Sequence, residues 1–424
     1  MALNKIAWIG RFTGPKGELA ERILHEVVPQ FPQCQFTFIG GATTLAVPTS
    51  ERQHVQIVSQ FITDIRGEIN KHDLIIGAGR VAMEAMRCGK PVIAVGERRY
   101  VGLIDRSTID VARQTNFGDS DWQSDFNLPG LVAELQQILS GQKTVDTQDY
   151  PDFLREYDAE FVHQQVMQVY HAAVMDRYLK QFAELPVLIY HRVVDKPLQA
   201  SRYNIYATRD ELDWQLANLS KRGFTTTTFR DLWRGEQPRK PMILTFDDGY
   251  QDNYENLLPL LEKHASKAVI FALGDRSLQR NEWDIPSGEP PAALMSDSQL
   301  KACHDSGLIE IGSHGLRHAH LPQLDQGALQ REIADSKIQL QNVLGAPIYS
   351  FAYPYGDYGD REVSAVVQAG YQFAIGTVNG PRQFASDHFR IRRINMFPGT
   401  TPGAFRKKTS GYYLRYCKLK GKDF

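Results

Sequence analysis

The chain lacks several features that would place it in a simple structural class. Its four cysteines, Cys34, Cys88, Cys303 and Cys417, show no paired spacing, which favours free thiols in a reducing compartment over a disulfide framework. Lysine and arginine number 48 against 49 aspartates and glutamates, so the net charge of -1 gives no overall field for nucleic acid. No apolar run is long enough to span a membrane, and no internal repeat or low-complexity stretch is evident.

The composition that remains is that of a globular protein. The 424 residues favour two domains, and 42% hydrophobic with 23% charged residues is an ordinary balance. Residues 1–5 run directly into the strand predicted at 6–10, with no apolar leader between them. We therefore expect the protein to meet its substrate in the cytoplasm.

Residues 1–145 alternate between strand-like and helix-like segments, which predicts a doubly wound, Rossmann-like parallel sheet. The strands are expected at 6–10, 35–40, 55–61, 74–77 and 91–95, and the helices at 18–28 and 81–88. Between the fourth strand and its helix lies Gly77-Ala78-Gly79-Arg80. Such a turn either binds a phosphate at the helix N-terminus or is a plain turn.

Two further segments flank the second half of the chain. Residues 146–184 are predicted to be a helical linker, because aromatic and apolar residues step by about four from Phe153 to Phe182. Residues 403–424 form a tail in which Lys and Arg alternate with Tyr and Leu. This tail either contacts anionic lipid headgroups at the inner membrane face or is simply solvated.

The chemistry is concentrated in two motifs that each follow an apolar strand. Asp247 and Asp248 come directly after the strand expected at 241–246, and His314 and His318 follow the one expected at 308–312. Four-residue spacing would place both imidazoles on one side of a helical turn, facing one ion. A neighbouring carboxylate would supply a third ligand and leave a coordination position open for water.

At these residues the chain resembles the NodB-type polysaccharide deacetylases, carbohydrate esterases that remove acetyl groups from sugars. The resemblance covers about residues 185–400, through the segments 186–192, 244–250, 311–314 and 351–356. It implies a distorted barrel of strands and helices over 185–402. It also implies that Asp247 is the general base, that Asp248, His314 and His318 bind a divalent metal, and that the Tyr355 backbone N–H faces the oxyanion. An Asp-His-His set favours Zn²⁺.

The chain departs from the common family pattern at two places. Ala352 stands where the third motif usually has an arginine that orients the base, and Arg392 or Arg393 is a candidate replacement. The late histidine that usually supplies the acid is absent from 390–396. One branch of the family has an early histidine instead, in a segment that Tyr190–Val193 matches, so His191 is the candidate acid. His320 is either a supporting residue or a surface histidine.

The first domain resembles the nucleotide-binding C-terminal half of GT-B glycosyltransferases, through residues 8–12, 16–17 and 84–94. The resemblance implies that Arg11 and Lys16 contact a diphosphate and that Glu84 contacts the ribose. Gly77 replaces an acidic partner of Glu84, and the acceptor half of that fold is missing, so binding or scaffolding is favoured over transfer.

The sequence thus predicts a metal-dependent N-deacetylase that acts on an acetamido sugar of a surface polysaccharide or glycolipid precursor. The saccharide is expected to be lipid-linked or nucleotide-linked. A GT-B glycosyltransferase and a non-catalytic glycan-binding protein are the competing hypotheses.

Overall fold

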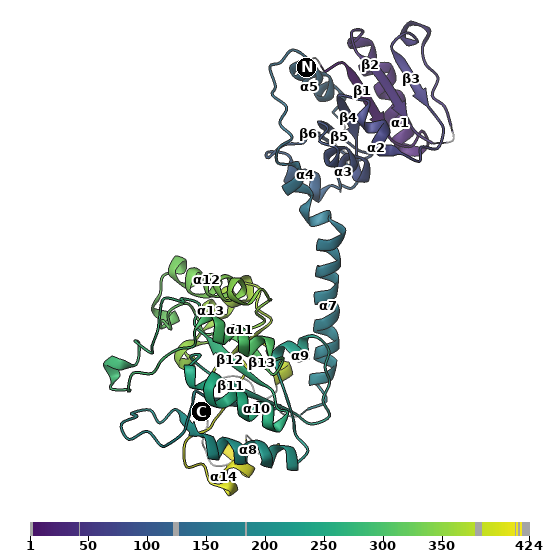
Figure 1. The fold of residues 1–424 in the computed structure, drawn as a ribbon. Coiled ribbons are helices and arrows are strands. Elements are labelled where there is room, and N and C mark those ends of the chain that lie inside the picture. Colours follow the sequence, from purple (N-terminus) through teal and green to yellow (C-terminus); the bar gives the residue numbers. More distant parts are fainter. Residues whose placement is uncertain are drawn as a thin grey trace. The chain divides into compact units, whose positions relative to one another are not determined.

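The computed structural model describes residues 3–41, 43–121, 127–182, 185–377, 384–411, 413, 416 and 417 (Figure 1). The chain divides into two compact units, Met1–Val166 and Met167–Phe424. The division falls within helix α7 (Ala159–Leu179). Each unit has its own buried hydrophobic clusters.

The first unit is built on a six-stranded sheet of order β3-β2-β1-β4-β5-β6. Its strands are β1 (Lys5–Ile9), β2 (Gln35–Ile39), β3 (Val55–Val58), β4 (Leu74–Gly77), β5 (Val92–Val95) and β6 (Tyr100–Leu103). Its helices are α1 (Gly14–Arg22), α2 (Ile65–Asn70), α3 (Gly79–Arg87), α4 (Ile109–Gln114), α5 (Leu128–Leu139) and α6 (Tyr150–Leu154). A π turn, Ile23–Val27, and a 3-10 turn, Val28–Gln30, continue α1.

Helices cover both faces of this sheet, because its central strands are apolar on both sides. In β1, Ile6 and Trp8 pack in one cluster with residues of α1 and α5, while Ala7 and Ile9 pack in a second with residues of α2, α3, α4 and α6. Strands β1 to β5 pair in parallel, as predicted, but β6 pairs antiparallel with β5. The connection between β5 and β6 is only residues 96–99, which is too short for a parallel crossover.

The second unit contains an eight-stranded sheet of order β15-β14-β13-β12-β11-β7-β16, in which β10 also pairs with β11. Every pair in this sheet is parallel. Its strands are β7 (Val187–Tyr190), β10 (Thr225–Thr227), β11 (Pro241–Phe246), β12 (Ala268–Ala272), β13 (Ile309–Ser313), β14 (Ser350–Ala352), β15 (Phe373–Ile375) and β16 (Ile394–Asn395). Strands β8 (Arg192–Val194) and β9 (Tyr206–Thr208) form a separate pair.

Helices surround the sheet of the second unit (Figure 1). They are α8 (Arg209–Lys221), α9 (Phe229–Trp233), α10 (Leu258–His264), α11 (Asp297–Asp305), α12 (Gln326–Leu344), α13 (Asp360–Gln368) and α14 (Pro402–Lys408). Along β11, Leu244 and Phe246 belong to the cluster that includes residues of α8, α10, α11 and α12. Ile243 belongs to a second cluster, with Phe271 and Phe373 from β12 and β15. The strands therefore bury both faces.

The segment 391–396 connects the two ends of this sheet. Ile391 forms a parallel bridge with Ile375 of β15, and the Arg393 N–H donates to the Thr377 carbonyl at 2.7 Å. Three residues later the Met396 N–H donates to the Ile189 carbonyl of β7 at 3.1 Å. A short run of chain thus turns a curved parallel sheet into a distorted barrel. It also brings the side chains of 391–396 to the rim where β7 and β11 end.

One predicted segment differs from the structure. Within the helical linker predicted over 146–184, the helix is interrupted, because Asp158 is extended (φ -63°, ψ 134°) between the turn Arg155–Tyr157 and α7. Within the basic tail, α14 presents the exposed side chains of Arg406 and Lys407, whereas Tyr412, Leu414, Arg415 and residues 418–424 lie outside the described residues.

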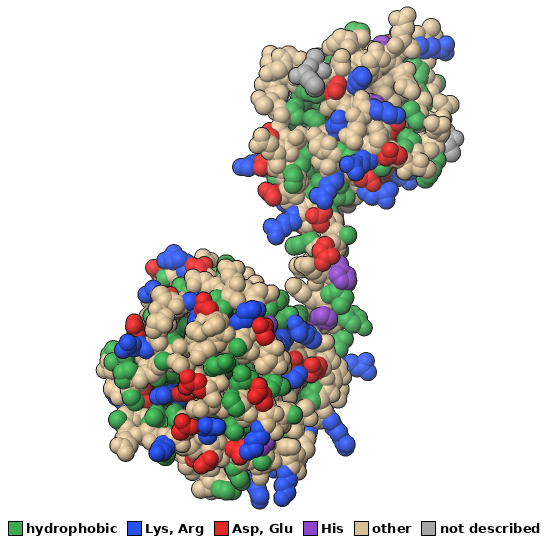
Figure 2. All heavy atoms as spheres, in the orientation of Figure 1, with side chains coloured by type: hydrophobic (Ala, Val, Ile, Leu, Met, Phe, Trp, Pro, Cys, Tyr) green, Lys and Arg blue, Asp and Glu red, His purple; other side chains and the backbone are tan. Residues whose placement is uncertain are grey.

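The surface that Figure 2 draws shows positive and negative side chains interspersed on each unit. Among the described residues, no helix is long and apolar enough to cross a membrane. All four cysteines are unpaired.

Candidate metal centre and active site

A cavity of about 370 Å³ opens where the strands of the second unit end. Catalytic groups in barrels of parallel strands come from this carboxyl end. The cavity brings together the residues predicted from four separate motifs: His191 after β7, Asp247 and Asp248 after β11, His314 and His318 after β13, and Tyr355 after β14. Its other lining residues are Ile189, Tyr203, Ile205, Asp284, Tyr353, Gly356, Thr377, Asn395, Met396 and Phe397.

The two adjacent aspartates point in different directions because the chain turns sharply after β11. Asp248 has a φ of 75° and Gly249 a φ of 71°. A Cβ on Gly249 would lie 3.1 Å from the Ala272 Cβ, so this turn favours glycine for two reasons. Asp248 adopts a conformation that short polar residues tolerate better than most. The turn therefore lets one carboxylate serve a metal while its neighbour serves as a base.

Asp248, His314 and His318 form a buried cluster whose candidate ligand atoms all lie within 4.8 Å of one another. The Asp248 Oδ1 atom is 3.4 Å from the Nε2 atoms of both histidines and has no hydrogen-bond partner among the described residues. The His314 Nδ1 atom is 2.8 Å from the Ala352 carbonyl. Donation of the Nδ1 proton to this carbonyl leaves Nε2 as the metal-facing lone pair. These observations fit a site for one divalent metal ion.

The charges in this cluster suit a metal site. Burial lowers the pKa of His314 to about 4, so its imidazole is neutral near pH 7, as a metal ligand must be. Burial alone would raise the pKa of Asp248, but its interaction with the nearby His318 imidazole outweighs burial, and the pKa falls below its usual value. The carboxylate is therefore ionised.

The two histidines do not lie on a helical turn, contrary to the prediction. Residues 314–318 form a loop in which Gly315 has a φ of 82° and His318 a φ of 61°, values incompatible with a right-handed helix. The loop is held by Glu332, whose carboxylate accepts the Arg317 N–H at 2.7 Å. His318 stacks on Trp283 with ring centroids 4.7 Å apart. A buried loop, and not helical periodicity, brings the two imidazoles together.

Asp247 forms a fully buried ion pair with Arg393, one of the two candidate replacements for the missing arginine. Arg393 Nη1 lies 2.6 Å from Oδ1 and Nη2 lies 2.7 Å from Oδ2. Arg393 Nε donates to the Gly376 carbonyl, and Nη1 also donates to the Thr245 hydroxyl. Burial would raise the pKa of Asp247, but the charges of Arg393 and His314 hold it below its usual value. The carboxylate is ionised and held in one orientation.

The remaining predicted residues also reach the cavity. His191 lines it, and the His191 backbone carbonyl accepts a hydrogen bond from Asn253 Nδ2 at 2.9 Å. Tyr355 has a φ of 60° and lines it too. The exposed ring of His320 stacks on Tyr355 at 3.7 Å and 4°, so it supports a cavity-lining residue. Positive φ at Asp248, His318 and Tyr355 is the kind of backbone strain that functional sites retain.

Sequence reasoning missed Trp283 and Asp284, which lie in the excursion between β12 and α11. Asp284 is buried and lines the cavity. Burial, and then the negative charge of Asp248, raise the pKa of Asp284 to about 6. No periodicity marks this excursion, and its only local signal is an aromatic residue next to an acid.

In the first unit, the three residues predicted to bind a nucleotide are engaged in ion pairs. Arg11 pairs with Glu97 at 2.9 Å, and Lys16 pairs with Asp119 at 2.6 Å. Glu84 pairs with Arg80 one helical turn away. Two carboxylates therefore stand where an anionic diphosphate would bind, and the nucleotide site stays a prediction.

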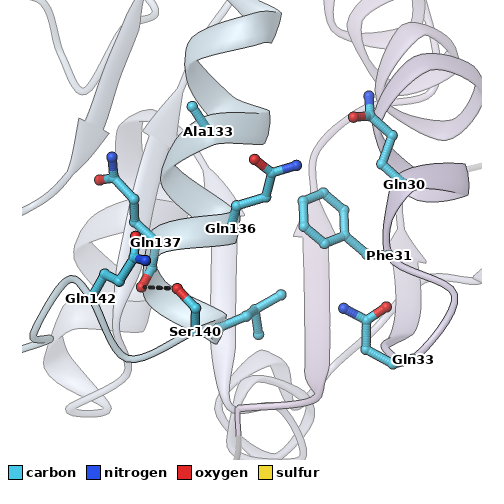
Figure 3. A pocket seen from close by; sticks show the side chains of 9 residues that line it. Gln30, Phe31, Gln33, Ala133, Gln136, Gln137, Ser140 and Gln142 are labelled. Carbon is cyan, nitrogen blue, oxygen red and sulfur yellow. Dashed lines mark hydrogen bonds between the residues drawn. The ribbon is translucent and has the colours of Figure 1, made fainter.

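The first unit also contains a hollow of about 610 Å³ at the end of α5 (Figure 3). Gln136 and Gln137 lie on one side of it, and Gln30 and Phe31 on the other. Its nine lining residues are Gln30, Phe31, Gln33, Ala133, Gln136, Gln137, Leu139, Ser140 and Gln142. None of these described side chains is a carboxylate, imidazole or thiol, so the hollow offers no hydrolytic chemistry.

Comparison with known proteins supports the site in the second unit. Residues 234–374 match the polysaccharide deacetylase family. Residues 234–374 form a polysaccharide deacetylase domain. This deacetylase domain includes Asp247, Asp248, His314, His318 and Tyr355, whereas His191 and Arg393 lie outside the matched residues.

Relatives extend the similarity beyond the matched residues. A Bacillus subtilis (strain 168) protein assigned as a polysaccharide deacetylase, YxkH, is 28% identical over 241 residues, covering 56% of this chain and 78% of its own length. The poly-beta-1,6-N-acetyl-D-glucosamine N-deacetylase of Staphylococcus epidermidis is 24% identical over 169 residues, covering 38% of this chain and 56% of its own. The prediction that the chain is an enzyme of the polysaccharide deacetylase type is confirmed by these matches.

Solved structures similar to the deacetylase domain include two bacterial proteins. The polysaccharide deacetylase BC0361 from Bacillus cereus is 26% identical with a TM-score of 0.46, covering 54% of this chain and 69% of its own. The Streptococcus pyogenes deacetylase PplD is 23% identical with a TM-score of 0.45, and the match covers 54% of this chain and 99% of PplD.

Proposed function

We propose that the chain is a metal-dependent N-deacetylase that hydrolyses the acetamido group of a sugar in a surface polysaccharide or glycolipid precursor. The single observation that supports this best is the pair of adjacent carboxylates with divided roles. Asp248 lies in the buried Asp-His-His cluster, and Asp247 is ion-paired with Arg393 in the same cavity. Metal-assisted hydrolysis needs this combination of an ion site and an adjacent base.

Asp248, His314 and His318 would hold the ion, and their two imidazoles and one carboxylate favour Zn²⁺ over harder cations. A divalent metal bound there would polarise the acetyl carbonyl and lower the pKa of water. The donor geometry fits three protein ligands with the cavity side left open.

Asp247 is placed to take the proton from the attacking water, because its carboxylate is ionised and lines the cavity. Arg393 keeps that carboxylate charged and oriented. The Tyr355 backbone N–H would donate to the oxyanion, a contribution whose removal typically lowers the rate about 10²- to 10³-fold. His191 would give a proton to the departing amine, which needs one to leave. All four groups line or support one cavity.

Incubation of the metal-loaded protein with N-acetylglucosamine oligomers tests this function. We expect release of acetate, loss of activity on chelation and recovery on adding Zn²⁺. Asp247→Asn should keep the metal but lower turnover at least about 10²-fold, the usual size of a general-base contribution. Near-normal turnover in Asp247→Asn, or activity that survives complete metal removal, would refute the proposal.

A further inference from the structure

The mouth of the catalytic cavity is unusually aromatic. Six Phe and Tyr side chains among the described residues are exposed: Phe61, Tyr157, Tyr170, Tyr203, Tyr355 and Phe397. The last three, with 42%, 42% and 46% of their surface accessible, all line this one cavity. Exposed rings gathered at a single site indicate a binding surface.

Tyr203 is presented by a loop that a single buried carboxylate holds in place. Glu289, 3% exposed, accepts the Ser201 hydroxyl at 2.6 Å, the Arg202 N–H at 2.9 Å and the Tyr203 N–H at 3.1 Å. Arg202 Nη1 adds a hydrogen bond to the Ser287 carbonyl at 2.7 Å. A carboxylate that accepts three donors from consecutive residues fixes the backbone of that loop, and so the position from which the Tyr203 side chain extends.

The rings of Tyr355 and Phe397 also contact neighbouring side chains. The Tyr355 ring is stacked on the His320 ring and makes a T-shaped contact with the His318 ring, whose centroid lies 4.5 Å away. The Lys408 ammonium lies 5.6 Å from the Phe397 ring centroid and donates to the Asn395 carbonyl at 2.7 Å. The three rings come from three different parts of the chain and line one cavity.

We infer that Tyr203 and Phe397 bind the sugar next to the one being deacetylated, and that Glu289 is the residue that positions Tyr203. This inference rests on the proposed function for the choice of ligand. The cavity volume of about 370 Å³ is near the low end for ligand pockets, so the remainder of a saccharide chain must lie over its mouth. A pyranose has apolar C–H faces and a rim of hydroxyls.

The polar groups at this mouth favour a saccharide over an acyl chain. The Asp284 carboxylate and the Asn395 side-chain amide line the same cavity as the three rings. Each can hydrogen-bond a sugar hydroxyl, whereas an acyl chain offers neither of them a hydrogen-bond partner.

Binding without turnover tests the inference directly. In an Asp247→Asn background, calorimetry would measure the Kd of N-acetylglucosamine and of its β-1,4- and β-1,6-linked tetramers. We expect Tyr203→Ala and Phe397→Ala each to raise the Kd of the better tetramer about 5- to 30-fold, the usual effect of truncating a buried aromatic contact. The effect on the single sugar should be several-fold smaller. Tyr203→Trp should retain tetramer affinity, and Tyr170→Ala, an exposed ring on α7, is the matched control.

Glu289 is tested by its dependence on Tyr203. Glu289→Gln should weaken tetramer binding, but the Glu289→Gln/Tyr203→Ala double variant should bind no worse than Tyr203→Ala alone, because the carboxylate acts through the ring. Additive losses would contradict a positioning role. An unchanged tetramer Kd in Tyr203→Ala, or an equal loss for the single sugar, would overturn the subsite. Absence of acetate release by the wild-type enzyme would contradict the proposed function alone, since these measurements need no turnover.

Discussion

Replacing Arg393 with methionine tests whether this arginine orients the base Asp247. In the common family pattern, an arginine at the position of Ala352 has that role. The Arg393 side chain is fully buried and its two Nη atoms lie 2.6 and 2.7 Å from the Asp247 oxygens. An arginine this close typically lowers the pKa of a carboxyl group by about 1 to 3 units. Without it, burial would raise the pKa of Asp247, because the guanidinium of Arg393 is the largest influence that opposes burial.

The base must be ionised to accept a proton, so activity is lost as the pH falls through its pKa. Raising that pKa in Arg393→Met therefore moves the acid limb of the pH profile of kcat/KM upward, by about 1 to 3 pH units. At pH 7 the turnover should fall about 10²- to 10⁴-fold if both protonation and orientation of the base are lost. The metal content should stay near that of the wild type, because Asp248, His314 and His318 are unchanged.

Stability provides an independent reading of the same pair. Removing one partner of a buried ion pair typically lowers the free energy of unfolding by about 3–5 kcal/mol. The double variant Asp247→Asn/Arg393→Met should be more stable than Arg393→Met alone, since it leaves no unpaired charge. Arg392→Ala, at the adjacent position, is the control and should leave the acid limb in place. An unshifted acid limb in a fully metallated Arg393→Met enzyme would refute the reasoning.

Four further predictions follow from other contacts. His318→Ala should purify folded but hold little metal by elemental analysis, because an open site with three protein ligands cannot spare one; full occupancy would contradict the ligand assignment. His191→Gln should keep the metal and lose about 10²- to 10⁴-fold in turnover on an acetamido sugar, yet far less on an activated acetyl ester whose leaving group needs no proton; equal losses would exclude it as the acid. Above about pH 6, metal-free Asp284→Asn should have a higher Tm than the metal-free wild type. This difference in Tm should vanish as the pH falls toward 3.8, the ordinary carboxyl pKa, because the raised pKa of Asp284 in the folded state makes the wild type lose stability as the pH rises through that range. A Tm difference that does not depend on pH would contradict this. A nucleoside diphosphate should raise the Tm of the full chain, an effect that Lys16→Ala abolishes and Asp119→Asn strengthens by removing the competing carboxylate; no shift in any variant would exclude the site.

The sequence was informative where local pattern and position coincide. Apolar runs marked β11 and β13 to within a residue, and the polar residues just after them are the ones that line the cavity. This works because parallel strands are buried on both faces, which makes them continuous apolar segments, and because their carboxyl ends meet at one rim. Motif order then gave Asp247, Asp248, His314 and His318 as one site.

Where the geometry depends on tertiary contacts, sequence spacing misled. Four-residue spacing predicted a helical turn for His314 and His318, yet Glu332 and Trp283 hold them in a loop. The contribution of Asp284 could not be foreseen either, because it comes from an irregular excursion that folds back over the metal cluster.

Arg393 shows why a catalytic contact can move along the sequence without moving far in space. Ala352 ends β14, which pairs with β15, and β15 in turn bridges to Ile391, two residues before Arg393. The bridge from Ile391 to Ile375 fixes the register that directs the guanidinium toward Thr245 and Asp247. Sequence alone left Arg392 and Arg393 as equal candidates, because the choice depends on which of two successive side chains faces the barrel interior. The register of the bridge between Ile375 and Ile391, which are 16 residues apart in the chain, decides which of the two side chains faces inward. No local sequence pattern encodes that register.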